Sequence, residues 1–117
     1  MKLKILTILS VVTLIPALYM IFLFAPTEAT QGHAQRIFYI HVPLAVIGAY
    51  GSAILLFIGS LGFLITRDLK WDRFGAVAAE MGIVFTSAQL LTAMMWAKPI
   101  WGTWYVFDSR GTLQIVL

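Results

Sequence analysis

Three long apolar runs, separated by short polar segments, make up most of the chain. The first run covers 5–24 and holds no charged residue, the second covers 37–65, and the third covers 74–95. A helix needs about 20 apolar residues to cross about 30 Å of hydrocarbon. The pattern therefore predicts an all-α membrane protein, with three transmembrane helices in a single membrane domain over 1–117.

Two polar segments and one aromatic segment separate and follow these runs. Residues 25–36 and 66–73 are rich in polar, charged, proline or glycine residues, which predicts loops there. Residues 96–112 hold three of the four tryptophans. Tryptophan and tyrosine gather where a membrane meets water, so we expect a short interfacial aromatic segment after the third helix. Pro99 and Gly102 make one straight helix from 74 through 108 unlikely, which predicts a helix break near Lys98 and Pro99.

Composition supports the membrane assignment and narrows the function. Hydrophobic residues make up 61% of the chain and charged residues 11%, against roughly 45–50% and 25% in soluble domains. Membrane lipid is therefore an expected partner. The net charge is +3 and the basic residues are scattered, so we expect no nucleic-acid binding. The chain has no cysteine and shows no nucleophile-and-base set or nucleotide-binding glycine loop, so we expect no enzyme activity.

The basic residues also predict how the chain crosses the membrane. The N-terminus and the second polar segment carry five of them and the other segments carry three: Lys2, Lys4, Arg67, Lys70 and Arg73 against Arg36, Lys98 and Arg110. Cytoplasmic loops are enriched in lysine and arginine. We therefore expect a multi-pass protein with a cytoplasmic N-terminus and with the aromatic segment on the outer face.

Several residues inside the apolar runs are unusual for a simple span. Pro16 predicts a local kink in the first helix. Four small residues in the second run would let a neighbouring helix approach closely: Gly48, Gly51, Ser52 and Gly59. Glu80 lies about two turns into the third run, where a carboxylate is costly without a partner. We expect it to make a hydrogen bond facing the bundle, and a proton relay is the alternative.

Two interpretations of the aromatic segment stay open at this point. One is an ordinary interfacial belt. The other is a platform for a flat, apolar, anionic ligand, whose carboxylates Lys98 or Arg110 would receive. His41, in the first turns of the second helix, lies at about the depth of this segment, and an imidazole is a common axial ligand of haem iron. A hydrogen-bonding residue at the interface is the ordinary alternative for His41, and His33, in the loop, is expected to be solvated.

Two segments together resemble a known family. Residues 26–43, in which PTEATQG leads to RIFYIHVP, resemble the first outer loop of the CcmC family of cytochrome c biogenesis proteins. Residues 96–112 (WAKPIWGTWYVFDSRGT) resemble the tryptophan-rich WWD segment of the same haem-handling family. The order and spacing of both motifs agree across the chain, which is identified as a member of this family.

The resemblance implies a haem-binding component of c-type cytochrome biogenesis in a bacterial inner membrane. His41 matches the first of two haem-ligating histidines by its place in the His-Val-Pro motif, and the implied cofactor is haem b. The residues that match the WWD segment would make up the rest of the site: Trp101, Trp104, Tyr105, Phe107, Asp108 and Arg110. The implied partners are subunits of an ABC-type haem exporter and a periplasmic haem chaperone.

The chain departs from the family pattern in several ways. Tyr105 and Phe107 stand where the family has tryptophans, and Gly111 stands in place of a leucine. The family also has more membrane spans, and its second ligand histidine would lie beyond Leu117, so a second axial ligand has to come from elsewhere. These departures support a second hypothesis, in which the chain is an accessory transmembrane subunit of a larger respiratory or photosynthetic complex with a degenerate haem site.

Overall fold

Helices account for nearly all of the structure. The computed structural model describes residues 2–105 and 108–116, without the side chains at positions 110 and 114. The helical segments follow one another along the chain: α1 (Lys2–Tyr19), η1 (Met20–Phe24), α2 (Gln35–Pro43), η2 (Leu44–Tyr50), α3 (Gly51–Thr66), α4 (Leu69–Trp101) and α5 (Ser109–Val116). The η segments are π-helices that continue from α-helices without a break. These described residues contain no β-strand, so the all-α prediction is confirmed.

Three continuous helices in the described part of the chain are long and apolar enough to cross a membrane. They comprise Lys2–Phe24, Gln35–Thr66 and Leu69–Trp101, with 23, 32 and 33 residues. At about 1.5 Å per residue, even the shortest is about 35 Å long, which exceeds the thickness of a bilayer core. The prediction of three transmembrane helices is confirmed, and the protein is a multi-pass membrane protein.

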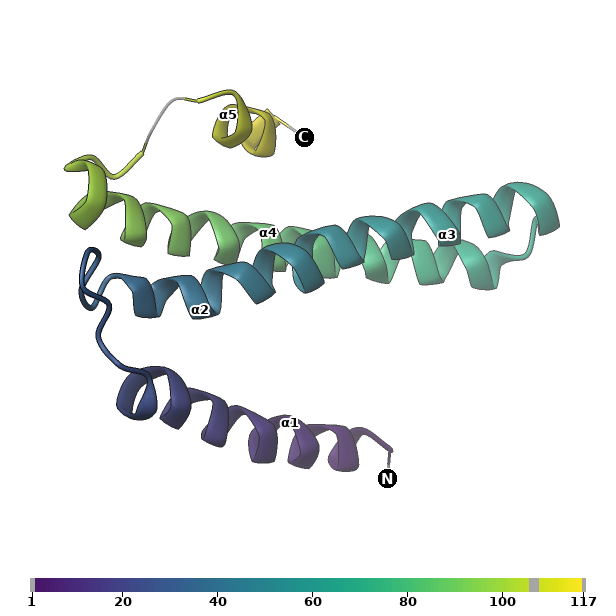
Figure 1. Cartoon of the computed structure of the whole chain (residues 1–117). Coiled ribbons are helices and arrows are strands. Elements are labelled where there is room, and N and C mark those ends of the chain that lie inside the picture. The colour runs from purple at the N-terminus through teal and green to yellow at the C-terminus, as the bar shows by residue number, and fades with distance from the viewer. Residues whose placement is uncertain (1, 106–107, 117) are drawn as a thin grey trace.

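The second and third spans form a long antiparallel hairpin. Figure 1 shows the continuous rod of α2, η2 and α3 lying beside α4, with a tight turn that joins α3 to α4. α1 runs apart from this hairpin, and α5 folds back over α4. The molecule measures 54 × 39 × 15 Å. Since one helix with its side chains is about 10–12 Å across, the spans lie in a single layer.

Glycines allow the two arms of the hairpin to pack closely. A Cβ added to Gly48 would lie 2.6 Å from the ring of Phe85, and one added to Gly59 would lie 2.9 Å from the backbone of Gly75. The expected close helix approach is therefore confirmed at these two positions. It is wrong at Gly51, where a Cβ would meet nothing within 4 Å. The close contacts hold η2 and α3 against α4.

α4 begins earlier than the predicted third helix. The loop predicted at 66–73 is reduced to residues 67–68. Arg67 takes a left-handed conformation (φ 56°) that ends α3, and the Asp68 side chain accepts a 2.9 Å hydrogen bond from the backbone amide of Lys70. Aspartate is a preferred residue at this N-cap position. Polarity marks the edge of the apolar region, but a capped helix continues beyond that edge, which is why the loop prediction fails here.

α4 also ends later than predicted, at Trp101. The break expected near Lys98 and Pro99 falls instead at Gly102, whose φ of 75° suits glycine and few other residues. Proline within the last turn removes one helical hydrogen bond, but α4 continues past it. The Gly102 amide donates to the Lys98 carbonyl oxygen, and the Lys98 ammonium donates to the Gly102 carbonyl oxygen, both at 3.0 Å. These two bonds close the end of α4.

The prolines of the first two spans coincide with changes of helix type. Pro16 lies inside α1, and the π-helical η1 begins one turn later. Pro43 is the last residue of α2, and η2 follows it directly. Proline lacks a backbone N–H and therefore interrupts the regular hydrogen-bond ladder. π-Helical turns are often found at functional sites, and η2 begins three residues after His41.

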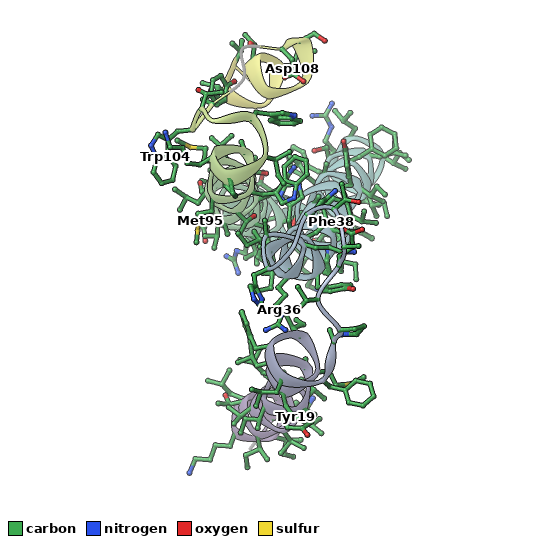
Figure 2. The ribbon with its side chains drawn as sticks, turned by 60° about the vertical axis from the view of Figure 1, so that its left-hand side comes forward. Tyr19, Arg36, Phe38, Met95, Trp104 and Asp108 are labelled. Carbon is green, nitrogen blue, oxygen red and sulfur yellow. The ribbon has the colours of Figure 1, made fainter. Side chains whose placement is uncertain are left out.

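One arginine links the first span to the hairpin. The Arg36 guanidinium, at the start of α2, donates hydrogen bonds to the backbone carbonyl oxygens of Phe22 and Ala25. Figure 2 shows its side chain between the two helices. A cation is favoured at the C-terminal end of a helix because the last carbonyl groups carry partial negative charge. Among the described residues, this is the one side chain that joins the first span to α2 by hydrogen bonds.

The carboxylate inside the third span is not paired. Glu80 is exposed on α4 and makes no hydrogen bond or ion pair with any described residue. The single layer of helices leaves its face of α4 uncovered. The prediction that Glu80 makes a hydrogen bond within the bundle is therefore wrong.

Candidate functional site

His41 lies on α2 and faces α4. Its Nδ1 lies 3.2 Å from the backbone carbonyl oxygen of Gln89 and 3.1 Å from the hydroxyl oxygen of Thr92. Residues three apart on a helix share one face, so both partners belong to the same face of α4. The two contacts tie the imidazole to the opposite arm of the hairpin and restrict the orientation of the ring.

The partners of Nδ1 determine where the imidazole proton lies. The carbonyl oxygen of Gln89 can only accept a hydrogen bond, so Nδ1 carries the proton and donates. Thr92 is consistent with this, because its own hydroxyl proton is directed to the carbonyl oxygen of Ala88 or Gln89, at 3.0 and 2.8 Å. In a neutral ring, Nε2 then keeps its lone pair. Nε2 of His41 makes no hydrogen bond with any described residue.

A groove along α4 brings His41 and the aromatic segment together. The groove has a volume of about 1150 Å³, slightly larger than the roughly 300–1,000 Å³ of most ligand pockets. It is lined by five of the residues considered from the sequence: His41, Trp101, Trp104, Tyr105 and Asp108. Alanine, leucine and isoleucine side chains from α3, α4 and α5 form much of the remaining wall. The space can accept a large, flat, apolar ligand.

A series of aromatic rings runs along one wall of this groove. The ring of Phe38 lies 6.4 Å from the imidazole of His41 and 6.3 Å from the ring of Trp96, measured between centroids. Trp96 meets Trp101 edge to face at 4.9 Å, an arrangement that aromatic pairs favour. The indole N–H of Trp96 also donates to the side-chain oxygen of Gln31 at 3.2 Å. The ring series therefore connects His41 to the first loop and to the end of α4.

Lys98 and Trp104 lie at the end of α4, where Figure 2 shows Trp104 projecting from the ribbon. The Lys98 ammonium lies 5.6 Å from the centre of the Trp104 ring, within the range of a cation–π interaction. The same ammonium donates to the carbonyl oxygen of Gly102. Lys98 does not itself line the groove, so a ligand carboxylate would have to draw it away from both contacts.

Asp108 lies at the start of α5 (Figure 2) and acts as its N-cap. Its Oδ1 accepts a 2.8 Å hydrogen bond from the Gly111 amide, and its carbonyl oxygen accepts one of 3.1 Å from the Thr112 amide. Aspartate stabilises a helix start in this way. A Cβ at Gly111 would lie 2.8 Å from the hydroxyl oxygen of Tyr105, so the missing side chain at 111 makes room for Tyr105 in the groove wall.

Three other residues considered from the sequence are not placed in the groove. Phe107 lies outside the described residues, and so does the side chain of Arg110, whose backbone belongs to α5. His33 is exposed in the first loop and does not line the groove, as expected for a solvated histidine.

A carboxylate holds the turn of the first loop. Glu28 accepts hydrogen bonds from the backbone amides of Gln31 and Thr30. The hydrogen bond from the Gln31 amide is the main cause that holds the pKa of the Glu28 carboxyl below its ordinary value of 4.5. Desolvation opposes this effect, and hydrogen bonds from Thr30 lower the pKa by smaller amounts. Gly32 completes the turn with a φ of 57°. The turn presents the Gln31 side chain to Trp96 and so couples the loop to the groove.

The sequence does not single out Thr92, Gln89 or Phe38, although each contacts His41. Gln89 is buried, with 6% of its surface exposed, and its side-chain oxygen has no hydrogen-bond partner among the described residues. Polar residues within a span usually face the protein interior, so the spacing of positions 89 and 92 is the pattern that could have identified this face. No sequence pattern identifies the Gln89 backbone carbonyl as a partner of His41.

Comparisons with known proteins agree with one another. The family model of CcmC, heme exporter protein C, matches residues 1–117. The chain is 42% identical over 116 residues to heme exporter protein C of Escherichia coli (strain K12), covering 96% of this chain and 45% of that protein. It is 35% identical over 108 residues to heme exporter protein C of Rhodobacter capsulatus, covering 92% and 44%. It is 38% identical over 101 residues to a ccmC-like mitochondrial protein of Marchantia polymorpha named for cytochrome c biosynthesis, covering 86% and 44%.

The chain spans less than half the length of these relatives. No solved structure matches it. The family match includes both the segment around His41 and the aromatic segment that together line the groove. The chain therefore belongs to the CcmC family, the family of heme exporter protein C.

Proposed function

We propose that the chain binds haem in the groove beside α4 and acts as a haem-handling component of c-type cytochrome biogenesis. The observation that carries the proposal is the state of His41. Its Nδ1 donates to α4, which leaves the Nε2 lone pair available beside a large groove lined by aromatic rings. An imidazole nitrogen is a usual axial ligand of haem iron. The printed names of the relatives, heme exporter protein C and a cytochrome c biosynthesis protein, support the same function.

The residues of the groove fit a haem. Trp101, Trp104 and Tyr105 offer π faces for stacking against a planar macrocycle. Haem, when bound, supplies an iron centre whose axial positions accept nitrogen ligands. His41 would fill one of these positions, and no second histidine lines the groove among the described residues. A second axial ligand would have to come from outside these residues.

The other side chains would bind the rest of the cofactor. The aromatic residues, with Phe107, would exclude water from the faces of the ring. Arg110 or Lys98 would meet a propionate, since a carboxylate binds most strongly where a cation can donate to it. Asp108 would hold α5 at the edge of the groove through its N-cap bonds.

The family also suggests where the chain acts. We place it in the bacterial inner membrane with a cytoplasmic N-terminus and the aromatic segment outside, as the basic residues favour. Its proposed partners are subunits of an ABC-type haem exporter and a periplasmic haem chaperone. The comparisons do not favour an accessory subunit of a respiratory or photosynthetic complex, because the haem-exporter family model covers residues 1–117.

The test is a haem titration of the purified protein in detergent, followed by absorbance without added imidazole, because free imidazole could replace the His41 side chain on the iron. We expect His41→Ala to abolish the bound spectrum, because it removes a ligand from iron. Trp104→Ala should weaken binding by about 1–3 kcal/mol, which is the range for a large side chain that bound haem would bury. His33→Ala is the matched control, because it removes an exposed histidine that lies outside the groove. If His41→Ala binds haem as well as the parent protein, the proposed site is wrong.

A further inference from the structure

We infer that Thr92 is a positioning residue for the haem-ligating histidine, and that its hydroxyl helps to set which oxidation state of the iron the site prefers. The inference rests on the proposed haem function and adds a residue of α4 that touches His41 but does not line the groove.

Contacts with α4 set the orientation of the His41 ring. One N–H of His41 is shared between two acceptors on α4, the Thr92 hydroxyl at 3.1 Å and the Gln89 carbonyl at 3.2 Å. On α2 itself, Phe38 lies 6.4 Å from the imidazole with its ring tilted by 35°. Turning the imidazole over would break both hydrogen bonds at once, and hydrogen bonds in a partly buried site favour the arrangement that makes them. The ring is therefore held with Nε2 as the nitrogen that can bind iron.

A second hydrogen bond made by Thr92 strengthens the one at His41 Nδ1. The Thr92 hydroxyl already donates to the Ala88 or Gln89 carbonyl oxygen. Hydrogen bonds in such a chain polarise one another, which makes the hydroxyl oxygen a better acceptor for the imidazole N–H. A hydrogen bond from the second ring nitrogen of a metal-bound histidine raises the basicity of the ligand. A more basic ligand stabilises the more positively charged ferric iron more than the ferrous iron.

The Thr92 hydroxyl and the Gln89 backbone carbonyl make separable contributions to the position of His41. The Gln89 carbonyl accepts from Nδ1 whatever side chain stands at 92, so it keeps part of the orientation in any variant. Thr92→Val removes the hydroxyl, both as acceptor from His41 and as donor to the Ala88 or Gln89 carbonyl, and keeps a β-branched side chain of similar shape. Thr92→Ser keeps the hydroxyl and removes a methyl group. The two variants therefore distinguish a hydrogen bond from packing.

The experiment has one measurement without haem and one with it. In the apoprotein in detergent, ¹⁵N NMR of the imidazole should show a protonated Nδ1 in the parent and in Thr92→Ser, with a larger share of the other tautomer in Thr92→Val. In the haem complex, we expect Thr92→Val to reduce the preference for ferric over ferrous haem about two- to tenfold, the range of one net hydrogen bond. Tenfold corresponds to 59 mV for a one-electron couple, so the midpoint potential should rise by about 20–60 mV. Thr92→Ser should keep the parent potential.

The outcomes separate this inference from the function on which it rests. A protonated Nε2 in the parent apoprotein overturns the inference, and so does a potential in Thr92→Val equal to that of the parent. If Thr92→Ser and Thr92→Val shift the potential equally, packing rather than the hydroxyl is responsible, and the inference is again wrong. A parent protein that binds no haem overturns the proposed function instead, which the titration shows before any potential is measured.

Discussion

Replacement of Gly48 by alanine should push η2 away from α4. The added methyl carbon would lie 2.6 Å from Cγ and 2.7 Å from Cβ of Phe85. Carbon atoms in favourable contact are about 3.5–4.0 Å apart, so the helices have to separate by about 0.9 Å unless the Phe85 side chain leaves its position. Overpacking of this kind costs about 1–3 kcal/mol of folding free energy.

The same displacement should reach the site. Gly48 lies about two turns along the second span from His41. A separation of about 0.9 Å would stretch the 3.1 Å contact between His41 Nδ1 and the Thr92 hydroxyl to about 4.0 Å, beyond hydrogen-bonding range. We therefore expect Gly48→Ala to lower both the free energy of unfolding and the affinity for haem.

Gly51→Ala is a matched control for this prediction. A Cβ at Gly51 would meet nothing within 4 Å, and glycine to alanine within a helix otherwise stabilises by about 0.5–1 kcal/mol. Unfolding in mixed detergent micelles, followed by circular dichroism, gives the free energy for both variants, and a haem titration gives the affinity. Equal stability of the two variants would refute the packing argument. A destabilised Gly48→Ala that binds haem like the parent would refute the coupling to His41.

Three further predictions concern the first loop, the first span and α5. Asp108→Ala should destabilise α5 by about 1 kcal/mol through loss of its N-cap, seen as faster amide hydrogen exchange in α5, whereas Asp108→Asn should stay near the parent rate. The pKa of Glu28 is lowered in the folded loop, so the contribution of this carboxylate to stability should be complete above pH 4.5 and lost as pH falls through the lower folded pKa. A ¹³C NMR titration of the Glu28 carboxyl checks this, and an unshifted pKa would contradict it. Arg36→Ala should free the first span from the hairpin. Spin labels on one cysteine introduced in the first span and one in the hairpin should then show a broader distance distribution. An unchanged distribution would show that the Arg36 hydrogen bonds do not hold the span.

The membrane fold could be predicted because length and hydropathy decide it. Each apolar run is long enough to span a bilayer, and the structure has a helix over each. The helix ends could not be predicted in the same way, because they depend on single local interactions. Asp68 caps α4 before a charged first turn, and the left-handed conformation of Gly102 ends it three residues after Pro99.

The site could be predicted in part. The aromatic residues and His41 line one groove because the sequence places them near the same end of neighbouring spans. The partners of His41 could not be predicted, since a backbone carbonyl has no sequence pattern and Thr92 resembles any polar residue on a helix. The relation between Tyr105 and Gly111, two departures from the WWD pattern, also appears only in space, where the tyrosine hydroxyl occupies the room that a side chain at 111 would need.

The spans differ in length, so whether the groove lies in water or in lipid should depend on the thickness of the bilayer. The first span is about 35 Å long and α4 about 50 Å, at 1.5 Å per residue. To fit a core of about 30 Å, α4 would have to tilt beyond the usual 0–40°, so part of it projects. Lysine and arginine near the end of a span favour the headgroup level, so with Lys70 and Arg73 beside the α3–α4 turn the surplus length would fall at the opposite end, where Trp96 and Trp101 lie. A thinner bilayer would lift the mouth of the groove into water, and a thicker one would immerse it in lipid.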